Sequence, residues 1–455
     1  MTYDQALEWL NSLTNYERAP APDAMRAMRL ERMQALCEGL GNPQTAFRSI
    51  LVAGTNGKGS ICAMLYAILK AAGMTVGLYT SPHLVDLCER IRVAGPRATA
   101  QDDWIRQDDL AQALTHLQER MRSLPAVFAD NPPTYFEVLT AAAFWHFRQQ
   151  GVRVAVLEVG LGGRLDATNV VQQDVSVIGP IGLDHQAILG ASVSEIAAEK
   201  AAIIKHPHRV ISACQVPEVA AVLRRRAAEC DSSLIEVGRD LSIRIQRHAP
   251  DGLQCSIQTP RGEYTELQLS LLGRHQADNA ALAIAAIEAL ADSGMPHGAI
   301  RRGVAQVRWP GRIERVCEEP TVIFDGAHNP QAAEALRCVL QELWPDSPMH
   351  LLIGVSSDKA IQAIGERLCP LATTVTCTRS RHPRACDPHL LASQLTPVSR
   401  HLSVIPEAGD AYTYLVNTIG PQEVLVVTGS LFLVGQLSAA QHRLVRLNTA
   451  SGVDT

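Results

Sequence analysis

The first chemistry that this sequence offers is phosphate binding, in a glycine-rich segment with one central lysine within residues 49–73. The common phosphate loop reads G-x-x-x-x-G-K-[ST], but here Val52 stands at the first glycine position and Gly59 at the hydroxyl position. An apolar run, a tight turn, Lys58 and a helix-like segment still follow one another in the required order. Glycines in the turn permit positive φ angles and close approach of the backbone to an anion at a helix start. We therefore predict a phosphate loop; the alternative is a plain turn with a solvated lysine.

Three other polar groups follow apolar, strand-like runs. They are the hydroxyl of Ser81, the carboxylate of Glu158, and the pair Asp184 and His185. In open α/β sheets, ligands bind outside the carboxyl ends of the strands, so these groups could together hold one divalent cation. Imidazole suits transition metals better than Mg²⁺, and we therefore expect Mn²⁺ to substitute. The alternatives are a capping role for Glu158 and a hydrogen-bonded, buried His185.

A lysine lies on the apolar side of a predicted helix over residues 195–205. Lys200 shares its face with Ile196, Ile203 and Ile204, at spacings of four, three and four residues. This spacing predicts that its side chain turns inward, either for chemistry or to hold a second cation. The alternative is a side chain that runs along apolar surface with its ammonium group in water.

The second half of the chain repeats the pattern of a polar group at a strand end. Residues 325–330, which include Asp325 and His328, close one apolar run and open a helix. Together with residues 273–279 and Arg312, they predict nucleotide contacts that converge on a cleft between two domains.

The elements that must position these residues alternate between strand-like and helix-like segments. Expected strands lie at 50–52, 75–79, 152–159, 175–178, 209–212, 322–325, 350–354, 373–378 and 424–428. Such alternation predicts an α/β fold with a mostly parallel sheet that has helices on both faces. Alternating runs over 241–271 predict antiparallel additions at the edge of that sheet. The turn at 309–312 predicts the joint between two domains, 1–309 and a smaller α/β domain, 310–455.

Composition fits a globular protein without an obvious macromolecular partner. The 455 residues are 47% hydrophobic and 19% charged, and the formal net charge of −5 gives no reason to expect nucleic acid. Eleven cysteines are scattered singly, as is typical of small core residues in a reducing compartment. With no run of 18 apolar residues and no signal-like N-terminus, we expect no membrane association and a cytoplasmic location.

Nine motifs then match one family in order. They are GTNGKGS (54–60), TSPHL (80–84), EVGLGGRLDATN (158–169), GLDH (182–185), EKAAIIK (199–205), GRHQADN (273–279), PGR (310–312), DGAHNP (325–330) and VTGSLFLVGQ (427–436). In this order they resemble the folylpolyglutamate synthases and dihydrofolate synthases, relatives of the Mur ligases. The phosphate loop of that family is itself a form with glycine before the hydroxyl residue.

The resemblance implies a fold, a reaction and a set of roles. The fold would be a phosphate-loop domain of the Mur central type followed by a smaller, Rossmann-like glutamate ligase domain. ATP would phosphorylate a substrate carboxylate, and the amine of L-glutamate would attack the acyl phosphate to form an amide. The implied nucleotide site comprises Gly54, Thr55, Asn56, Gly57, Lys58, Gly59, Ser60, Asn279, Arg312 and Asp325. Ser81, Glu158 and His185 would hold Mg²⁺, and His328 would lie near the transferring phosphoryl group.

By the same resemblance, Lys200 is carbamylated and serves a second Mg²⁺, which an unmodified, positively charged lysine would repel. The acceptor would be dihydropteroate, a reduced folate such as tetrahydrofolate, or both. The positions implied for the pterin pocket are Thr134, Phe136, Arg164, Leu165, Asp166 and Ala167. Residues 27–29 depart from the family's usual pattern, which puts the N-terminal pterin contact in question. The family analogy also implies a monomer.

Two other functions fit parts of the sequence. A Mur-type ligase for peptidoglycan precursors would carry a nucleotide-sugar domain before the phosphate loop, where only about 50 residues stand here. A nucleotide switch that changes shape on ATP hydrolysis would not explain Asp325 and His328 in a second α/β domain.

Overall fold

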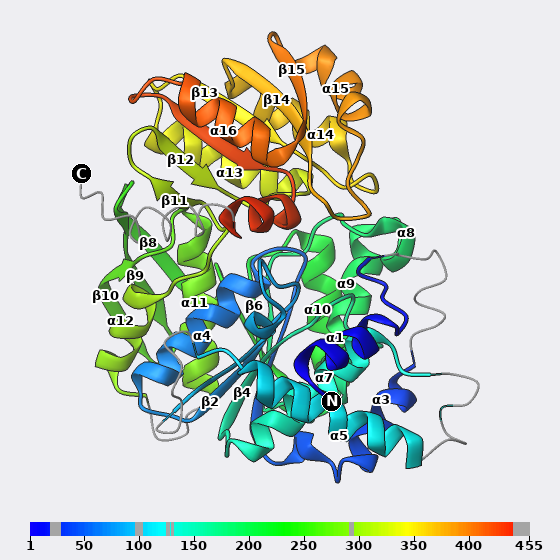
Figure 1. The fold of residues 1–455 in the computed structure, drawn as a ribbon. Coiled ribbons are helices and arrows are strands. Elements are labelled where there is room, and N and C mark those ends of the chain that lie inside the picture. The colour runs from blue at the N-terminus through cyan, green and yellow to red at the C-terminus, as the bar shows by residue number, and fades with distance from the viewer. Residues whose placement is uncertain (19–28, 96–102, 124–127, 129–131, 291–294, 440–455) are drawn as a thin grey trace, which may run out of the picture.

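The computed structural model describes residues 1–455 except 19–28, 96–102, 124–127, 129–131, 291–294 and 440–455. It contains three sheets, and the third, with its helices, forms a separate lobe at the top of Figure 1. The predicted α/β fold is confirmed. No helix among the described residues is long and apolar enough to span a membrane.

The first sheet has seven strands in the order β3-β2-β4-β1-β5-β6-β7. The strands are β1 (Arg48–Ala53), β2 (Val76–Tyr79), β3 (Ile91–Ala94), β4 (Val154–Glu158), β5 (Val175–Ile178), β6 (Arg209–Ser212) and β7 (Ser233–Glu236). β3 runs antiparallel to β2, and every other pairing in this sheet is parallel. The carboxyl ends of β1, β2, β4 and β5 therefore meet at one edge of the sheet.

Both faces of this sheet are covered, because its strands are apolar on both sides. In β1, Ile50 and Val52 belong to the core cluster shared with one set of helices, while Leu51 and Ala53 belong to the opposite cluster. The first set is α4 (Lys58–Ala71), α11 (His275–Leu290) and α12 (His297–Gln306). The other helices of this lobe are α1 (Tyr3–Asn11), α3 (Leu30–Gly39), α5 (Gln107–Ser123), α7 (Tyr135–Gln149), α8 (Gln186–Leu189), α9 (Val193–Ala201) and α10 (Pro217–Glu229).

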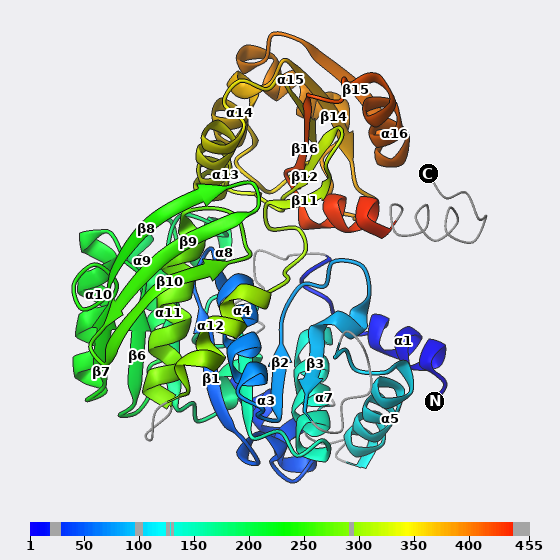
Figure 2. The same cartoon turned by 90° about the vertical axis from the view of Figure 1, so that its left-hand side faces the viewer.

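The second sheet corrects one expectation from the sequence. β8 (Ser242–Ala249), β9 (Gly252–Thr259) and β10 (Gly262–Leu269) are antiparallel, as predicted, but they form a sheet of their own instead of extending the parallel one. Figure 2 shows them curving over α11 and α12. Inward side chains such as Cys255 and Ile257 join the core around α11, so this sheet buries its apolar face on helices that already cover the first sheet.

The third sheet has six strands in the order β11-β12-β16-β13-β14-β15. They are β11 (Glu314–Cys317), β12 (Thr321–Phe324), β13 (Met349–Ile353), β14 (Thr374–Arg379), β15 (Leu402–Glu407) and β16 (Val424–Thr428), and only the β11–β12 pair of this sheet is antiparallel. Its labelled helices are α13 (Pro330–Leu343), α14 (Ile361–Leu368), α15 (Pro388–Leu395) and α16 (Ala408–Thr418). A further helix over 431–439, red in Figure 1, contacts the N-terminal lobe at Leu84.

Short 3₁₀ helices complete the chain. They are η1 (Pro43–Thr45), η2 (Leu87–Arg90), η3 (Ala167–Val170), η4 (Cys369–Leu371) and η5 (Thr396–Val398).

Candidate active site

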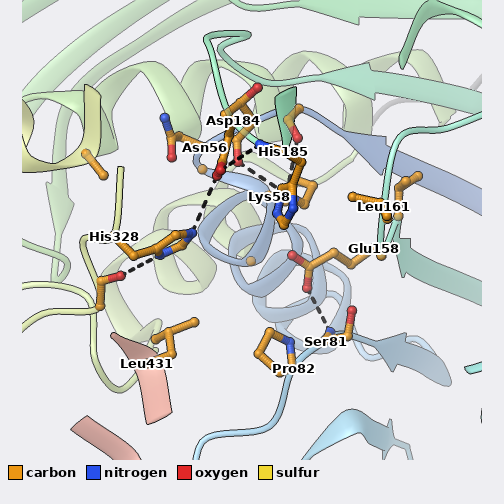
Figure 3. A pocket seen from close by; sticks show the side chains of 18 of the residues that line it. Asn56, Lys58, Ser81, Pro82, Glu158, Leu161, Asp184, His185, His328 and Leu431 are labelled. Atoms are coloured by element: carbon orange, nitrogen blue, oxygen red, sulfur yellow. Dashed lines mark hydrogen bonds and ion pairs between the residues drawn. The ribbon is translucent and has the colours of Figure 1, made fainter. Parts of the chain in front are cut away.

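A cavity of about 430 Å³ lies between the two lobes, at the carboxyl ends of the strands. Its walls include the phosphate loop, the ends of β2, β4 and β5, the starts of α11 and α13, and the joint near Arg312. Figure 3 draws the side chains of 18 of the residues that line it, from both lobes. The lining contains every site residue expected from the sequence except Arg164.

The predicted strand, turn and helix of the phosphate loop are present. β1 ends at Ala53, Gly54 has a φ of +151°, and Gly57, with a φ of +79°, precedes the first residue of α4. A Cβ atom on Gly57 would lie 2.7 Å from Oδ1 of Asn279, so this position requires glycine for space as well as for its backbone angle. The ammonium group of Lys58 donates to the carbonyl oxygens of Gly54 at 3.1 Å and Thr55 at 3.3 Å. The lysine therefore lies over the loop, where it can meet a phosphate.

Gly59 does not use the positive φ that a glycine permits. It lies within the first turn of α4, where its backbone is helical. What the position requires is space, because an added Cβ would lie 2.7 Å from the indole nitrogen of Trp309.

The three candidate metal ligands lie around one space. The backbone N–H of Ser81 donates to Oε2 of Glu158 at 3.1 Å, and Figure 3 shows Glu158 and His185 entering the same space beside Lys58. Burial raises the pKa of Glu158 and the charge of Lys58 opposes it. Burial, helped by the charge of Lys359, lowers the pKa of His185 to about 3. A neutral imidazole has a lone pair that can bind a metal.

The atoms that surround this space are of the kinds that bind a cation. The carboxylate of Glu158 is buried, and a buried negative charge is stable only beside a positive one. No group of three or more His, Cys, Asp or Glu residues within the described ranges is placed to hold a metal. An ion here would therefore also need oxygen atoms from the Ser81 hydroxyl, from water or from the nucleotide.

Lys200 turns inward, as predicted. Ser192 and Glu195 cap the start of α9 by exchanging side-chain and backbone hydrogen bonds, and Lys200 lies in the last turn, 5% exposed and in the cavity wall. Burial, followed by the charge of Lys58, lowers the pKa of Lys200 to about 7. The helix ends at Ala201 and does not reach Lys205 as expected. Lys205 instead donates to the carbonyl oxygen of Val171 at 2.8 Å, which holds this segment outside the helix.

Several residues join the two lobes across the cavity, and sequence reasoning missed most of these contacts. Asp184 pairs with the ammonium group of Lys359 at 2.6 Å and lies 3.6 Å from Nε2 of His328. Asn329 donates to Oδ1 of Asn56 at 2.9 Å and to Asp184 at 3.2 Å. Burial would raise the pKa of Asp184, but the nearby imidazole of His328 and the charge of Lys359 hold it well below its usual range.

The tautomer of His328 follows from its neighbours. Nδ1 lies 2.8 Å from the carbonyl oxygen of Gly326, which can only accept, so Nδ1 carries a proton. Nε2 then faces the cavity and Asp184, either as a lone pair or, when protonated, as a second donor.

Two further residues predicted to contact the nucleotide, Asp325 and Arg312, form hydrogen bonds with backbone groups and also line the cavity. Asp325 accepts from the N–H groups of Ile313 at 2.9 Å and Ala327 at 2.8 Å, and burial raises its pKa. Arg312 donates to the carbonyl oxygen of Gly311 at 3.2 Å, and its side chain is partly exposed in the cavity wall. These bonds fix the joint between the lobes at the edge of the cavity.

The candidate pterin positions divide into two groups. Thr134, Phe136, Leu165, Asp166 and Ala167 line the cavity. Thr134 caps α7, and Asp166 accepts from the N–H groups of Gly160 and Leu161, both at 2.9 Å, which shapes the loop after β4.

Arg164 points elsewhere. Its side chain is 52% exposed and pairs with Glu199 at 3.0 Å. Of the unusual segment 27–29, residues 27 and 28 lie outside the described residues.

Comparison with known proteins shows which family has this sequence. The Mur ligase middle domain matches residues 108–287, and the glutamate ligase domain of the Mur ligases matches residues 311–431. The dihydrofolate synthase/folylpolyglutamate synthase of Bacillus subtilis is 33% identical over 442 residues, which are 96% of this chain and 98% of that protein.

Solved structures agree over the whole fold. The folylpolyglutamate synthase of Mycobacterium tuberculosis complexed with ADP superimposes with a TM-score of 0.87 at 33% identity, covering 96% of this chain and 98% of the other. Escherichia coli FolC in complex with DHPP and ADP gives a TM-score of 0.84 at 31% identity, with the same coverage. From its motifs, its two lobes and these relatives, the chain belongs to the folylpolyglutamate synthase and dihydrofolate synthase family of Mur ligases.

Proposed function

We propose that this enzyme is an ATP-dependent ligase that joins L-glutamate to dihydropteroate, to reduced folates such as tetrahydrofolate, or to both. ATP phosphorylates the acceptor carboxylate, and the glutamate amine then displaces phosphate from the acyl phosphate to form the amide, with ADP as the other product. The observation that carries this proposal is a single cavity with a phosphate loop on one lobe and Asp325 and His328 on the other.

The chain's own residues act mainly by positioning and charge neutralisation. Backbone N–H groups at the start of α4 and the ammonium group of Lys58 would bind the phosphates. Asn279, Arg312 and Asp325 would contact the rest of the nucleotide. His328, with Nδ1 held by Gly326, would present Nε2 to the transferring phosphoryl group.

Ser81, Glu158 and His185 would hold Mg²⁺, and Mn²⁺ would be able to replace it. When bound, the ion would neutralise phosphate oxygens and make the γ-phosphorus more open to attack. The low pKa of His185 keeps its imidazole available at neutral pH.

Lys200 would be carbamylated and serve a second Mg²⁺. Its amine is buried in the cavity wall, where an anion beside bound metal is more stable than an ammonium ion. The neutral amine attacks CO₂: one N–C bond forms as one C=O π bond opens, and the amine proton passes to solvent, which leaves a carbamate anion. The pKa of the Lys200 amine, about 7, leaves a large fraction of this amine uncharged for the step at neutral pH.

The pterin ring would lie in the part of the cavity near Thr134, Phe136, Leu165, Asp166 and Ala167, while Arg164 would act only if it left Glu199. We also propose that the domains divide at residues 309 and 310. The enzyme would work as a monomer in the cytoplasm, where its eleven free cysteines stay reduced.

One assay tests the reaction. The enzyme is incubated with ATP, Mg²⁺, labelled L-glutamate and one acceptor: dihydropteroate, tetrahydrofolate or a muramyl precursor. We expect phosphate release and label incorporation in equal amounts with at least one pterin acceptor. Phosphate release without any acceptor would indicate a nucleotide switch, and incorporation only into the muramyl precursor would indicate a peptidoglycan ligase; either result contradicts the proposal.

A further inference from the structure

The phosphate loop of this chain is packed against an aromatic ring from the joint between the lobes. At Gly59, where the common loop has Ser or Thr, an added Cβ would lie 2.7 Å from Nε1, 3.2 Å from Cε2 and 3.3 Å from Cζ2 of Trp309. Real Cβ atoms essentially never approach within 3.0 Å of another heavy atom. The two positions are therefore matched to each other, because the indole occupies the space that a side chain at Gly59 would need.

Trp309 is held from more than one side, so it cannot easily move away. The guanidinium carbon of Arg92 lies 5.1 Å from the centre of its ring and 5.7 Å from the ring of Trp104, distances typical of cation–π contacts. The ring also packs against the core that contains α4.

The helix that precedes Trp309 is fixed on the phosphate-loop helix. α12 packs closely on α4, since a Cβ on Gly303 would lie 2.5 Å from Cα of Ile68. Figure 2 shows the chain rising from α12, beside α4, toward β11 of the upper lobe. The segment that joins the two lobes therefore begins at a helix that is packed rigidly on the phosphate-loop helix.

Trp309 is separated by only two residues from a candidate nucleotide contact. Gly311 turns the chain with a φ of +73°, and its carbonyl oxygen accepts from the N–H of Gly326 at 2.9 Å. Arg312 follows in the cavity wall, and the N–H of Ile313 donates to Asp325 at 2.9 Å. A short, hydrogen-bonded segment therefore links the ring on the phosphate loop to the nucleotide residues of the other lobe.

We propose that Trp309 is a positioning residue that sets the spacing between the phosphate loop and the Arg312–Asp325 side of the nucleotide site. Gly59 is the glycine that this indole requires. This inference rests on the proposed function only in assuming that the cavity binds the adenine nucleotide. This role of Trp309 explains why the loop departs from the common pattern: the position that usually carries Ser or Thr is glycine here, because the indole of Trp309 occupies the space of that side chain.

A double-mutant cycle on ADP binding tests the proposal by isothermal titration calorimetry with the full-length enzyme. The variants are Gly59→Ser, Trp309→Leu and the two combined. Gly59→Ser should weaken ADP binding about 100-fold when Trp309 is present, but less than about threefold when added to Trp309→Leu. Trp309→Leu alone should weaken ADP binding about tenfold, because the two sides of the site lose their fixed spacing.

Two further variants separate positioning from general packing. Trp104→Leu removes the other ring on Arg92 but does not touch Gly59, so it should leave ADP affinity within about twofold of the original protein. Trp309→Phe retains a flat ring at the joint and should restore affinity to within about threefold. Thermal unfolding of each variant identifies any protein that fails to fold.

The outcomes are distinct. If the original protein does not bind ADP, the proposed function fails. If it binds ADP but Gly59→Ser is equally costly with and without Trp309, or if folded Trp309→Leu binds ADP normally, the positioning role of Trp309 is wrong.

Discussion

Asn56 of the phosphate loop and Asn329 at the start of α13 bond to each other across the cavity, with Nδ2 of Asn329 donating to Oδ1 of Asn56 at 2.9 Å. Asn329 is buried and also caps its helix, since its Oδ1 accepts from the N–H of Ala332 at 2.8 Å. The side chain of Asn329 thus caps a helix in one lobe and forms a hydrogen bond with the phosphate loop of the other lobe. We infer that the two lobes are aligned for catalysis in part through this pair.

Two substitutions separate these roles of Asn329. Asn329→Asp keeps an oxygen for the helix cap but cannot donate, and it places a carboxylate beside Asp184. We expect the cap to be retained, a loss of thermal stability that comes only from repulsion between the two carboxylates, and a fall in kcat/KM of at least about tenfold. Asn329→Ala should lose activity similarly and also about 1 kcal/mol of stability with the cap. Equal activity of Asn329→Asp and the original protein, measured by acceptor-dependent phosphate release, would rule out the alignment role.

Glu158→Gln tests the proposed cation site. The change removes a buried negative charge while preserving the shape of the side chain, so the Mg²⁺ concentration for half-maximal activity should rise at least about tenfold. The control is Glu288→Gln, another buried carboxylate, which accepts from Thr259 at 2.8 Å and Tyr264 at 2.9 Å away from the cavity. That variant should change stability only. A Mg²⁺ titration with the same midpoint for Glu158→Gln and the original protein would remove Glu158 from the metal site.

Lys200→Ala should reduce turnover at least about 100-fold, and short carboxylates such as acetate should partly restore it by replacing the carbamate. Since carbamate forms only from the uncharged amine, its amount should fall as the pH drops below the Lys200 pKa of about 7. ¹³C NMR of enzyme equilibrated with labelled bicarbonate measures the carbamate directly.

Lys205→Ala provides the matched control for Lys200. Lys205 is a second lysine of low pKa, about 8 because of burial, but it donates to backbone carbonyl oxygens outside the cavity. Its loss should reduce stability without any rescue by carboxylates. Full turnover in Lys200→Ala, or no labelled carbamate in the original protein, would show that Lys200 has another role.

Acid stability tests the ion pair that ties Glu17 of the N-terminal segment to Arg90, the last residue of η2 before β3. Arg90 is 2% exposed, and it holds Glu17 with two hydrogen bonds, at 2.8 and 2.6 Å. Burial would raise the pKa of Glu17, but the charge and hydrogen bonds of Arg90 lower it below its ordinary 4.5. A carboxyl group with a lowered pKa in the folded state stabilises the protein fully above pH 4.5 and loses that effect as the pH falls through the folded value.

Glu17→Gln should therefore cost about 3 kcal/mol of unfolding free energy at pH 7, since it leaves the buried charge of Arg90 without its carboxylate partner. The difference between the two proteins should shrink steadily below pH 4.5. Urea unfolding at pH 7, 5 and 3 measures it. A difference that stays constant over this range would mean that Glu17 does not stabilise the fold as a carboxylate.

The parts of this site that could be predicted from the sequence are those determined by residues close together in the chain or by general rules of sheet topology. The strand, turn and helix around Lys58 follow from a local pattern, and the inward turn of Lys200 follows from helical spacing. Ser81, Glu158 and His185 meet because parallel strands end at one edge of a sheet, which is a rule of topology and needs no contact information.

The contacts that sequence could not predict join residues far apart in the chain. Asp184 and Lys359 are 175 residues apart, and no periodicity links them. The loop pattern indicates only that its glycines permit positive φ angles and close approach, whereas the need of Gly59 for space beside Trp309 is revealed only by the packed structure. The strands β8–β10 were correctly predicted as antiparallel, yet their separation from the parallel sheet depends on which helices their apolar face meets.

The central claim is that ATP and an acceptor carboxylate react directly in the cavity between the lobes. The most direct measurement uses dihydropteroate or tetrahydrofolate with ¹⁸O in the reacting carboxylate, together with ATP, Mg²⁺ and L-glutamate, and analyses the released phosphate by mass spectrometry. We predict that each phosphate released carries one ¹⁸O from the acceptor, because phosphoryl transfer to the carboxylate places that oxygen between carbon and phosphorus. Phosphate without ¹⁸O, in a reaction that does form the amide, would contradict this account.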